Sequence, residues 1–327
     1  MKKINLITPF VIVINALFLS TLLTGCPETD EIAPENRIKF AANHEFVTEQ
    51  NGLQAFQEMY DFQFDEVYEM AIGLTHEALS SGDVDVAKGY ATDGKIIELE
   101  LIKLEDDKEF FPRNHPALVA REEILDTYPE IKKIMVKVSA ALDTDTMMHL
   151  NYLVDIEQYG HREVAQHWLL KEGLISETLQ RPREIKPIII GSKNFTEQQI
   201  LGQIAILALE NAGIPVEDFT NMGDTKVIRS ALIESKIDMY WEYSLTIWET
   251  ICQEENIIAE NIPSPENIYQ TVSEIDSEKA LIWLDYAPLN NYYTIIMRKE
   301  HAEELEITTI SELSQWIKQV QAGTLIK

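Results

Sequence analysis

Beyond residue 37, short apolar runs alternate with amphipathic helical stretches, and this alternation limits the fold more than any other feature of the sequence. In the clearest unit, the buried-strand candidate 188–190 leads through a loop at 191–194 into a helix. Thr196 and Gln199 fit a capping box at the start of that helix, and the next strand is expected at 237–240. Such a unit predicts an α/β protein with ligand-binding loops at the carboxyl ends of its strands.

The part of the chain before this unit contains elements of both kinds. Strands are expected at 37–40, 67–70, 83–87 and 99–104, and helices at 52–60, 72–80, 131–142 and 164–171. Residues 177–187 are polar and contain Pro182, which indicates an internal linker.

Charge and composition exclude several classes of function. A net charge of −28 would repel a polyanion, so nucleic acid is not expected as a partner. Cys26 and Cys252 are the only two cysteines in the sequence, which excludes a disulfide scaffold and a cysteine-rich metal site. The sequence has no glycine-rich phosphate loop, nucleophile motif or helical zinc pair. We therefore expect no enzyme activity, no cofactor and no metal.

The first residues have the form of a signal peptide. Lys2 and Lys3 precede an apolar run over 4–23, which ends in Leu23-Thr24-Gly25-Cys26. This ending resembles a bacterial lipobox, so residues 1–25 are expected to be removed and Cys26 to carry the lipid. Residues 26–37, acidic and proline-bearing, would then form a tether on the outer side of the cell membrane. The alternative is a plain transmembrane anchor.

Eight short motifs are distributed along the chain: Gly191-Ser192-Lys193-Asn194-Phe195-Thr196-Glu197-Gln198, Tyr240-Trp241-Glu242-Tyr243-Ser244-Leu245-Thr246, Asn290–Arg298, Thr309–Leu313, Ile72–Thr75, Tyr90–Gly94, Leu104–Lys108 and Leu142–Met147. Together they resemble the motifs of one family, the substrate-binding lipoproteins of glycine betaine, proline betaine and choline-type ABC importers. The resemblance implies a two-lobed α/β fold of the periplasmic-binding-protein type, type II. It also implies a small quaternary-ammonium ligand, an ABC permease and ATPase as partners, and a monomer.

The order of these motifs is reversed relative to the family. The late half, 38–175, precedes the early half, 188–327, and each motif occurs once. A circular permutation of one domain explains this order, because neighbouring termini tolerate such a change. Residues 38–115 and 291–327 would then form one lobe, and 116–290 the other. The alternative is a fragment of a tandem binding protein.

The resemblance places a ligand cage on three tyrosines. A quaternary ammonium has no N–H donor, so aromatic faces must hold it. By motif, the cage positions are Tyr90, Tyr243 and Tyr293, and Asn114 stands where the family has a fourth tyrosine. We expect these side chains to converge on one cleft between the lobes.

The resemblance also implies groups that bind the carboxylate of a betaine. Lys193 and Thr246 are retained, but Glu49 stands where the family has an arginine. Replacing a bidentate cation by an anion weakens carboxylate binding, which favours choline. The altered positions leave open a sensor or interaction lipoprotein that no longer serves transport.

The lipobox leads to a direct prediction. Replacing Cys26 by serine removes the thiol that would receive the lipid. Metabolic labelling with a radioactive fatty acid should therefore mark the wild-type protein and not Cys26→Ser, whereas Cys252→Ser, the control, should label normally. Labelling that persists in Cys26→Ser contradicts the assignment.

Overall fold

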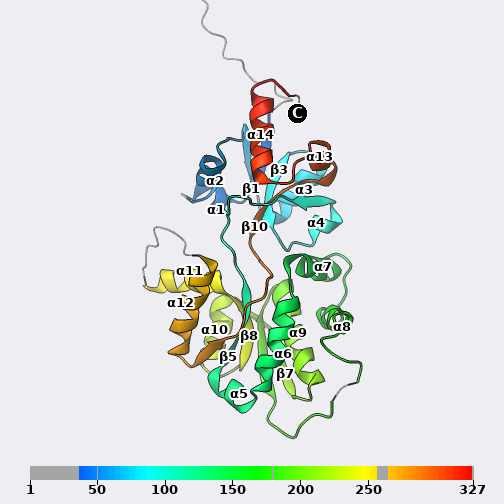
Figure 1. Ribbon diagram of the computed structural model, residues 1–327, viewed down its shortest axis with the longest axis vertical. Helices are drawn as coiled ribbons and strands as arrows, with labels where there is room; N and C mark the ends of the chain where they lie inside the picture. Colours follow the sequence, from blue (N-terminus) through cyan, green and yellow to red (C-terminus); the bar gives the residue numbers. More distant parts are fainter. Residues whose placement is uncertain (1–36, 50, 179, 256–263, 326–327) are drawn as a thin grey trace, which may run out of the picture.

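The computed structural model describes residues 37–325 except 50, 179 and 256–263. Within this range the chain forms two α/β lobes, stacked along the long axis in Figure 1, and each lobe is built on a five-stranded sheet. The upper lobe comprises β1 (Lys39–Ala42), α1 (His44–Thr48), α2 (Leu53–Tyr60), β2 (Glu66–Glu69), α3 (Ile72–Ser81), β3 (Val86–Tyr90), α4 (Lys95–Glu98), β4 (Leu101–Lys103), β10 (Tyr293–Arg298), α13 (Lys299–Glu304) and α14 (Ile310–Gln321).

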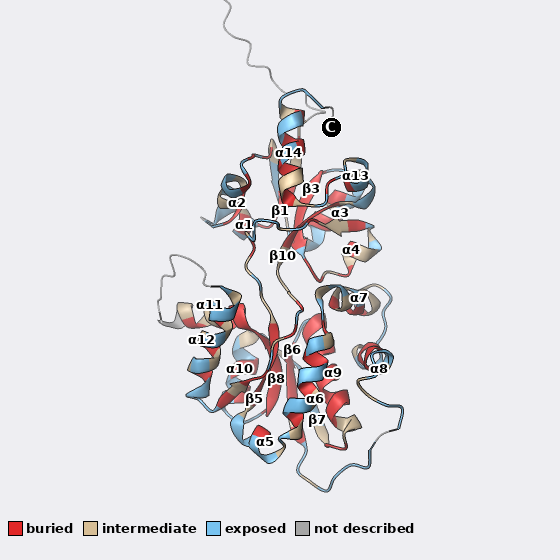
Figure 2. Ribbon diagram, in the orientation of Figure 1, coloured by how far each residue is buried: buried red, intermediate tan, exposed pale blue. Residues whose placement is uncertain are grey.

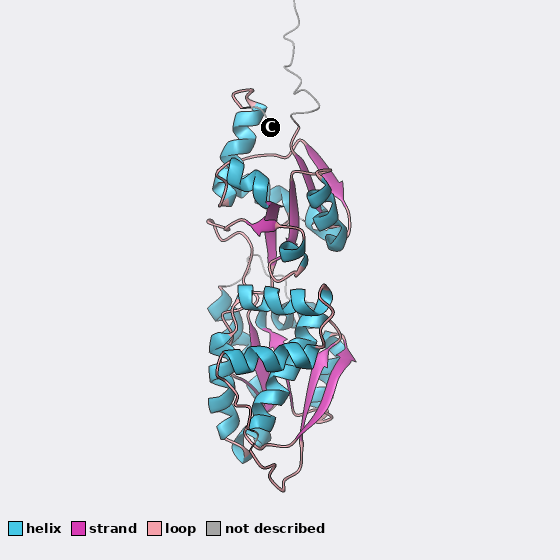
Figure 3. Ribbon diagram, turned by 90° about the vertical axis from the view of Figure 1, so that its right-hand side faces the viewer, coloured by secondary structure: helices cyan, strands magenta, loops and turns pink. Residues whose placement is uncertain are grey.

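The lower lobe is formed by the intervening part of the chain. It comprises β5 (Pro116–Arg121), α5 (Glu122–Thr127), α6 (Glu130–Ala141), α7 (Thr144–Asp155), α8 (His161–Lys171), β6 (Ile188–Lys193), α9 (Thr196–Asn211), β7 (Val216–Gly223), α10 (Thr225–Ile233), β8 (Met239–Tyr243), α11 (Ser244–Glu255), α12 (Pro265–Ser277) and β9 (Leu281–Trp283). Figure 3 shows the strands of each lobe flanked by helices, with loops between the lobes.

Both sheets have the same arrangement of strands. The orders are β2-β1-β3-β10-β4 and β7-β6-β8-β5-β9. In each sheet three neighbouring strands are parallel, and one strand, β10 or β5, runs antiparallel to the strands beside it. This is the two-lobed type II fold of periplasmic binding proteins, and it confirms the predicted fold class.

The lower core is built around β6 and α9. Ile188 and Ile190 are buried in the sheet, and α9 is packed on most of its surface by α6, α7 and α8. This packing explains why α9 is apolar nearly all round instead of along one stripe. Each buried leucine or isoleucine contributes roughly 1.5–3 kcal/mol to folding. Figure 2 shows buried residues concentrated along the strands and the inner helix faces.

Two segments of the chain cross from one lobe to the other, one between β4 and β5 and one between β9 and β10, and asparagines hold these crossings together. The backbone N–H of Asn114 donates to the side-chain oxygen of Asn290 at 2.7 Å, and the N–H of Asn291 donates to the carbonyl of Asn114 at 3.2 Å. A second link joins the β3–α4 region to α7, where Asn151 donates to the carbonyl of Thr92, in the loop before α4, at 2.8 Å. A Cβ at Gly94 would meet the backbone of α7 at 2.7 Å, so this contact requires glycine.

The structure confirms most of the expected elements and corrects one cap. The N-cap of α9 is Phe195, not Thr196, and its side chain makes no cap hydrogen bond. The hydroxyl of Thr196 instead donates to Asp155 at 2.6 Å, which links α9 to α7. A capping box is present at Thr309 and Glu312, where α14 begins.

Asp65 connects the two ends of the described chain. Its carboxylate accepts the backbone N–H of Ile38 at 2.7 Å and the side-chain amide of Gln321 at 2.9 Å. The first strand and the last helix of the upper lobe therefore meet at one residue. The short distance between them is what a circular permutation requires, and the permutation itself stays a prediction.

Reordering the chain tests this prediction. A variant in which residues 187–327 precede 27–176, joined by a short glycine-serine linker, should fold with the same helix content and one cooperative unfolding transition. A matched variant whose new chain ends lie inside α9, between Ile204 and Ala205, should not fold. Far-ultraviolet circular dichroism during thermal unfolding distinguishes them. Equal failure of both variants contradicts the prediction.

Candidate functional site: a cleft between the lobes

A cleft of about 440 Å³ lies between the lobes at the carboxyl ends of β3 and β6. Tyr90, Thr92 and Asp93 line it from the upper lobe. The lower lobe contributes the end of α7 and the start of α9, and Asn291 comes from one crossing. All these segments meet where the two strand ends face each other, so the cleft draws on both lobes at once.

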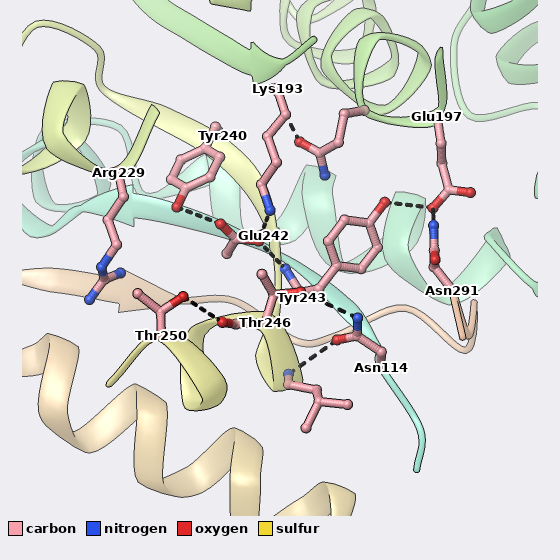
Figure 4. Close-up of polar contacts among 12 residues, drawn as sticks. Asn114, Lys193, Glu197, Arg229, Tyr240, Glu242, Tyr243, Thr246, Thr250 and Asn291 are labelled. Atoms are coloured by element: carbon pink, nitrogen blue, oxygen red, sulfur yellow. Dashed lines mark hydrogen bonds and ion pairs between the residues drawn. The ribbon is translucent and has the colours of Figure 1, made fainter. Parts of the chain in front are cut away.

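A buried carboxylate forms one wall of the cleft. Glu197, in the first turn of α9, is 2% exposed and accepts hydrogen bonds from the Tyr243 hydroxyl at 2.5 Å and from Asn291 at 2.8 Å (Figure 4). It also accepts one from Asn151 at 3.1 Å. Within the described part of the chain, each of these partners is neutral. The amino end of a helix also stabilises a negative charge. These hydrogen bonds hold the carboxylate in the wall of the cleft, and no ion pair with it is found among the described residues.

Tyr90 and Tyr293 form an aromatic pair in the upper lobe. Their ring centroids are 4.9 Å apart, and Tyr90 is 38% exposed in the cleft. Tyr293 is half-buried, and other protein groups cover part of its ring. The Lys88 ammonium lies 3.1 Å from its ring centroid, and Tyr292 packs at 5.0 Å. Burial and the Tyr90 hydroxyl raise the pKa of Tyr293 above its ordinary value.

Lys88 itself is fully buried. Its ammonium donates to the amide oxygen of Asn43 at 2.6 Å and lies 5.0 Å from the Phe46 ring. Burial lowers the pKa of Lys88 to about 7, and the charges of Glu45 and Glu49 oppose that shift only in part. Lys88 is therefore close to changing its charge at neutral pH.

Tyr243 lies in the lower lobe and is covered. It is 3% exposed, and Phe195 stacks on it with a centroid distance of 6.4 Å. The Lys193 ammonium lies 5.3 Å from the Tyr243 ring and forms a buried ion pair with Glu242 at 2.5 Å. Burial and the Glu197 carboxylate raise the pKa of Tyr243 well above its ordinary value. The ring that reaches the cleft here is Phe195, which is 41% exposed.

The remaining predicted site residues occupy other positions. The Asn114 side chain accepts the N–H of Leu245 at 3.1 Å and donates to the Thr246 hydroxyl at 3.4 Å, so both residues lie at the joint between a crossing and α11. Glu49 is exposed at the end of α1. Cys26 lies outside the described residues. The roles of these residues in ligand binding stay predictions.

The structure adds three residues that the sequence interpretation did not select: Phe195, Glu197 and Lys88. The first two lie inside a recognised motif, and their position at the start of the helix after β6 was a usable indication. Lys88 directly follows the predicted strand 83–87, and this position was a usable indication because lysine is rarely buried in a strand.

The family model for the substrate-binding domain of ABC-type glycine betaine transport systems matches residues 28–171 and 186–324. The chain belongs to this family. The two matched blocks are separated at the polar segment between α8 and β6.

Two curated relatives illustrate the similarity. The carnitine transport binding protein OpuCC of Listeria monocytogenes is 39% identical over 125 residues, covering 38% of this chain and 41% of the relative. The glycine-betaine-binding protein of Pseudomonas aeruginosa is 32% identical over 161 residues, covering 49% and 52%. The chain thus spans about half the length of the curated relatives it matches.

A solved structure of a glycine betaine/carnitine/choline ABC transporter is 30% identical, with a TM-score of 0.38, over 43% of this chain and 52% of that chain. Among the described residues, no helix is long and apolar enough to span a membrane. The same residues contain no group of three or more histidines, cysteines or carboxylates that could hold a metal ion.

The buried charge of Lys88 predicts a specific dependence of stability on pH. The pKa of Lys88 is lower in the folded state than its ordinary value of 10.5, so the unfolded chain binds more protons between pH 7 and pH 10. The energetic cost of burying Lys88 is therefore largest below pH 7 and falls as pH rises. Lys88→Met should unfold with a free energy on the order of 1–4 kcal/mol higher than wild type at pH 6.

Urea unfolding at pH 6, 8 and 10 measures this difference, which should shrink steadily across the series. Lys39→Met, at a partly exposed position of the same sheet, is the control and should show no such trend. A difference that is constant with pH contradicts the account of Lys88.

Proposed function

We propose that this protein captures a quaternary-ammonium osmolyte, such as choline or a betaine, in the cleft between its lobes. The observation that carries the proposal is the meeting of two exposed aromatic rings with one uncompensated carboxylate. Tyr90 and Phe195 line the cleft from opposite lobes, and Glu197 lies beside Phe195. The ligand ammonium binds between the rings, with its charge facing the carboxylate.

The chemistry of these groups favours a methylated cation over other small ligands. Aromatic faces attract a cation by roughly 0.5–2 kcal/mol per contact, and the attraction grows when water is excluded. A primary ammonium needs hydrogen-bond acceptors for its three N–H groups, whereas a trimethylammonium needs only surface contact and charge. The Glu197 oxygens already accept three hydrogen bonds, so they supply charge more readily than new hydrogen bonds.

Choline is the expected ligand when the carboxylate-binding groups are considered. The Lys193 ammonium is engaged with Glu242, and Glu49 is an anion where the family has an arginine. Both features weaken binding of a ligand carboxylate. We therefore expect choline to bind at least as tightly as glycine betaine, and Glu49→Arg to shift the preference toward betaine.

Movement of the lobes links capture to transport. The crossings and the contact of α4 with α7 allow the lobes to close around a ligand. The closed form delivers the ligand to an ABC permease and its ATPase, and the lipid on Cys26 keeps the protein at the outer surface of the membrane. The second candidate function is a sensor with the same cleft and the same ligands. The gene of a sensor would have no permease gene beside it.

Calorimetric titration tests the ligand class. The full chain in mild detergent should bind choline and glycine betaine, and Tyr90→Ala should weaken the affinity for choline at least tenfold, because one aromatic face is lost. Tyr68→Ala is the matched control, since Tyr68 is 40% exposed on β2, outside the cleft.

Three outcomes contradict parts of this proposal. Absence of binding for choline, glycine betaine, carnitine and proline betaine overturns the ligand class. Equal loss of affinity in Tyr90→Ala and Tyr68→Ala overturns the position of the site. Strong preference for glycine betaine that Glu49→Arg does not change overturns the account of specificity.

A further inference from the structure

Two of the three tyrosines expected to hold the ligand already face a lysine of the protein itself. Lys193 lies 5.3 Å from the ring centroid of Tyr243, and Lys88 lies 3.1 Å from that of Tyr293. The two lysines differ in their partners. Lys193 is paired with the Glu242 carboxylate at 2.5 Å, so its charge is neutralised locally. The Lys88 ammonium instead donates a hydrogen bond to the neutral amide of Asn43.

The position of Lys88 affects the site from behind. The side chain is fully buried, so it does not itself contact a ligand in the cleft. Its ammonium covers one face of Tyr293, and Tyr90 packs on the same ring at 4.9 Å and borders the cleft. A charged Lys88 occupies the face of the Tyr293 ring that would otherwise attract a ligand cation. Its positive charge also repels a second cation placed at Tyr90.

We propose that Lys88 is a specificity-determining positioning residue: its charge on Tyr293 opposes binding of a cation at Tyr90, so that binding of a quaternary ammonium is coupled to loss of a proton from Lys88. This inference rests on the proposed function. The ligand cannot bind the face of Tyr293 that Lys88 covers. Tyr90 and Phe195 are then the rings that receive the ligand. The coupling also makes affinity for a cation rise with pH.

Other titratable groups surround Lys88 and define the controls. Glu45 and Glu49 on α1 act on Lys88 through their charge, and Glu45 also accepts a hydrogen bond from Asn43. On β10 the neighbour is Tyr293, whose raised pKa keeps it neutral near pH 7. On its own strand, Tyr90 lies two residues away.

The opposite face of the sheet carries one further titratable pair. A Cβ at Gly89 would lie 2.9 Å from the His76 ring, and His76 pairs with Asp93 at 3.4 Å, at the edge of the cleft. Lys88→Met leaves this pair unchanged, so the variant isolates the effect of the Lys88 charge.

Calorimetry of the full chain with tetramethylammonium, which has a charge and no other functional group, tests the coupling. The wild-type affinity should rise roughly tenfold from pH 6 to pH 8.5. At pH 7 the binding heat should depend on the ionisation enthalpy of the buffer, because protons are released on binding. Lys88→Met should bind at pH 6 with the affinity that wild type reaches at pH 8.5, with no dependence on buffer. Lys39→Met should behave as wild type.

The possible results separate the two proposals. If wild type binds and Lys88→Met shows the same pH profile, the role of Lys88 is overturned and the proposed function stays in place. Failure of tetramethylammonium, choline and glycine betaine to bind wild type or Lys88→Met at any pH overturns the proposed function, and this inference with it. Urea unfolding shows whether each variant is folded.

Discussion

The buried carboxylate of Glu197 is the interaction on which the cleft depends. It accepts hydrogen bonds from Tyr243 on β8, from Asn151 on α7 and from Asn291 on a crossing, and thereby fixes three segments that are distant in the sequence. Asn151 extends this link to the upper lobe through the Thr92 carbonyl. The carboxylate is thus fixed by neutral donors at a helix start, in the wall of the cleft that we propose receives a cation.

The second determinant of the cleft is the position of two buried lysines, Lys193 and Lys88, beside tyrosine rings. Lys193 with Glu242 forms a neutral buried pair, and burial of a paired charge costs far less than burial of an isolated one. Among the described residues, the Lys88 ammonium contacts the Asn43 amide and the rings of Phe46 and Tyr293, and burial lowers its pKa. The protein cations thus occupy Tyr243 and Tyr293, and the rings left to face the cleft are Tyr90 and Phe195.

The sequence predicts the backbone better than the site. Apolar runs locate β6 and β8 because central strands are buried on both faces, whereas β7 is polar and largely exposed at the edge of its sheet and has no such pattern. Motifs select Tyr90, Tyr243 and Tyr293, which lie at the ends of β3, β8 and β10. They do not reveal which ring is covered, because Phe195 on Tyr243 and Lys88 on Tyr293 are contacts set by the tertiary packing.

The most direct test of this account is a crystal structure with choline bound. The account predicts the ligand nitrogen within about 6 Å of the Tyr90 and Phe195 ring centroids, beside Glu197, with Lys88 still on the face of Tyr293. A ligand nitrogen on the Tyr293 face, with Lys88 displaced, or a ligand outside the cleft, would contradict it.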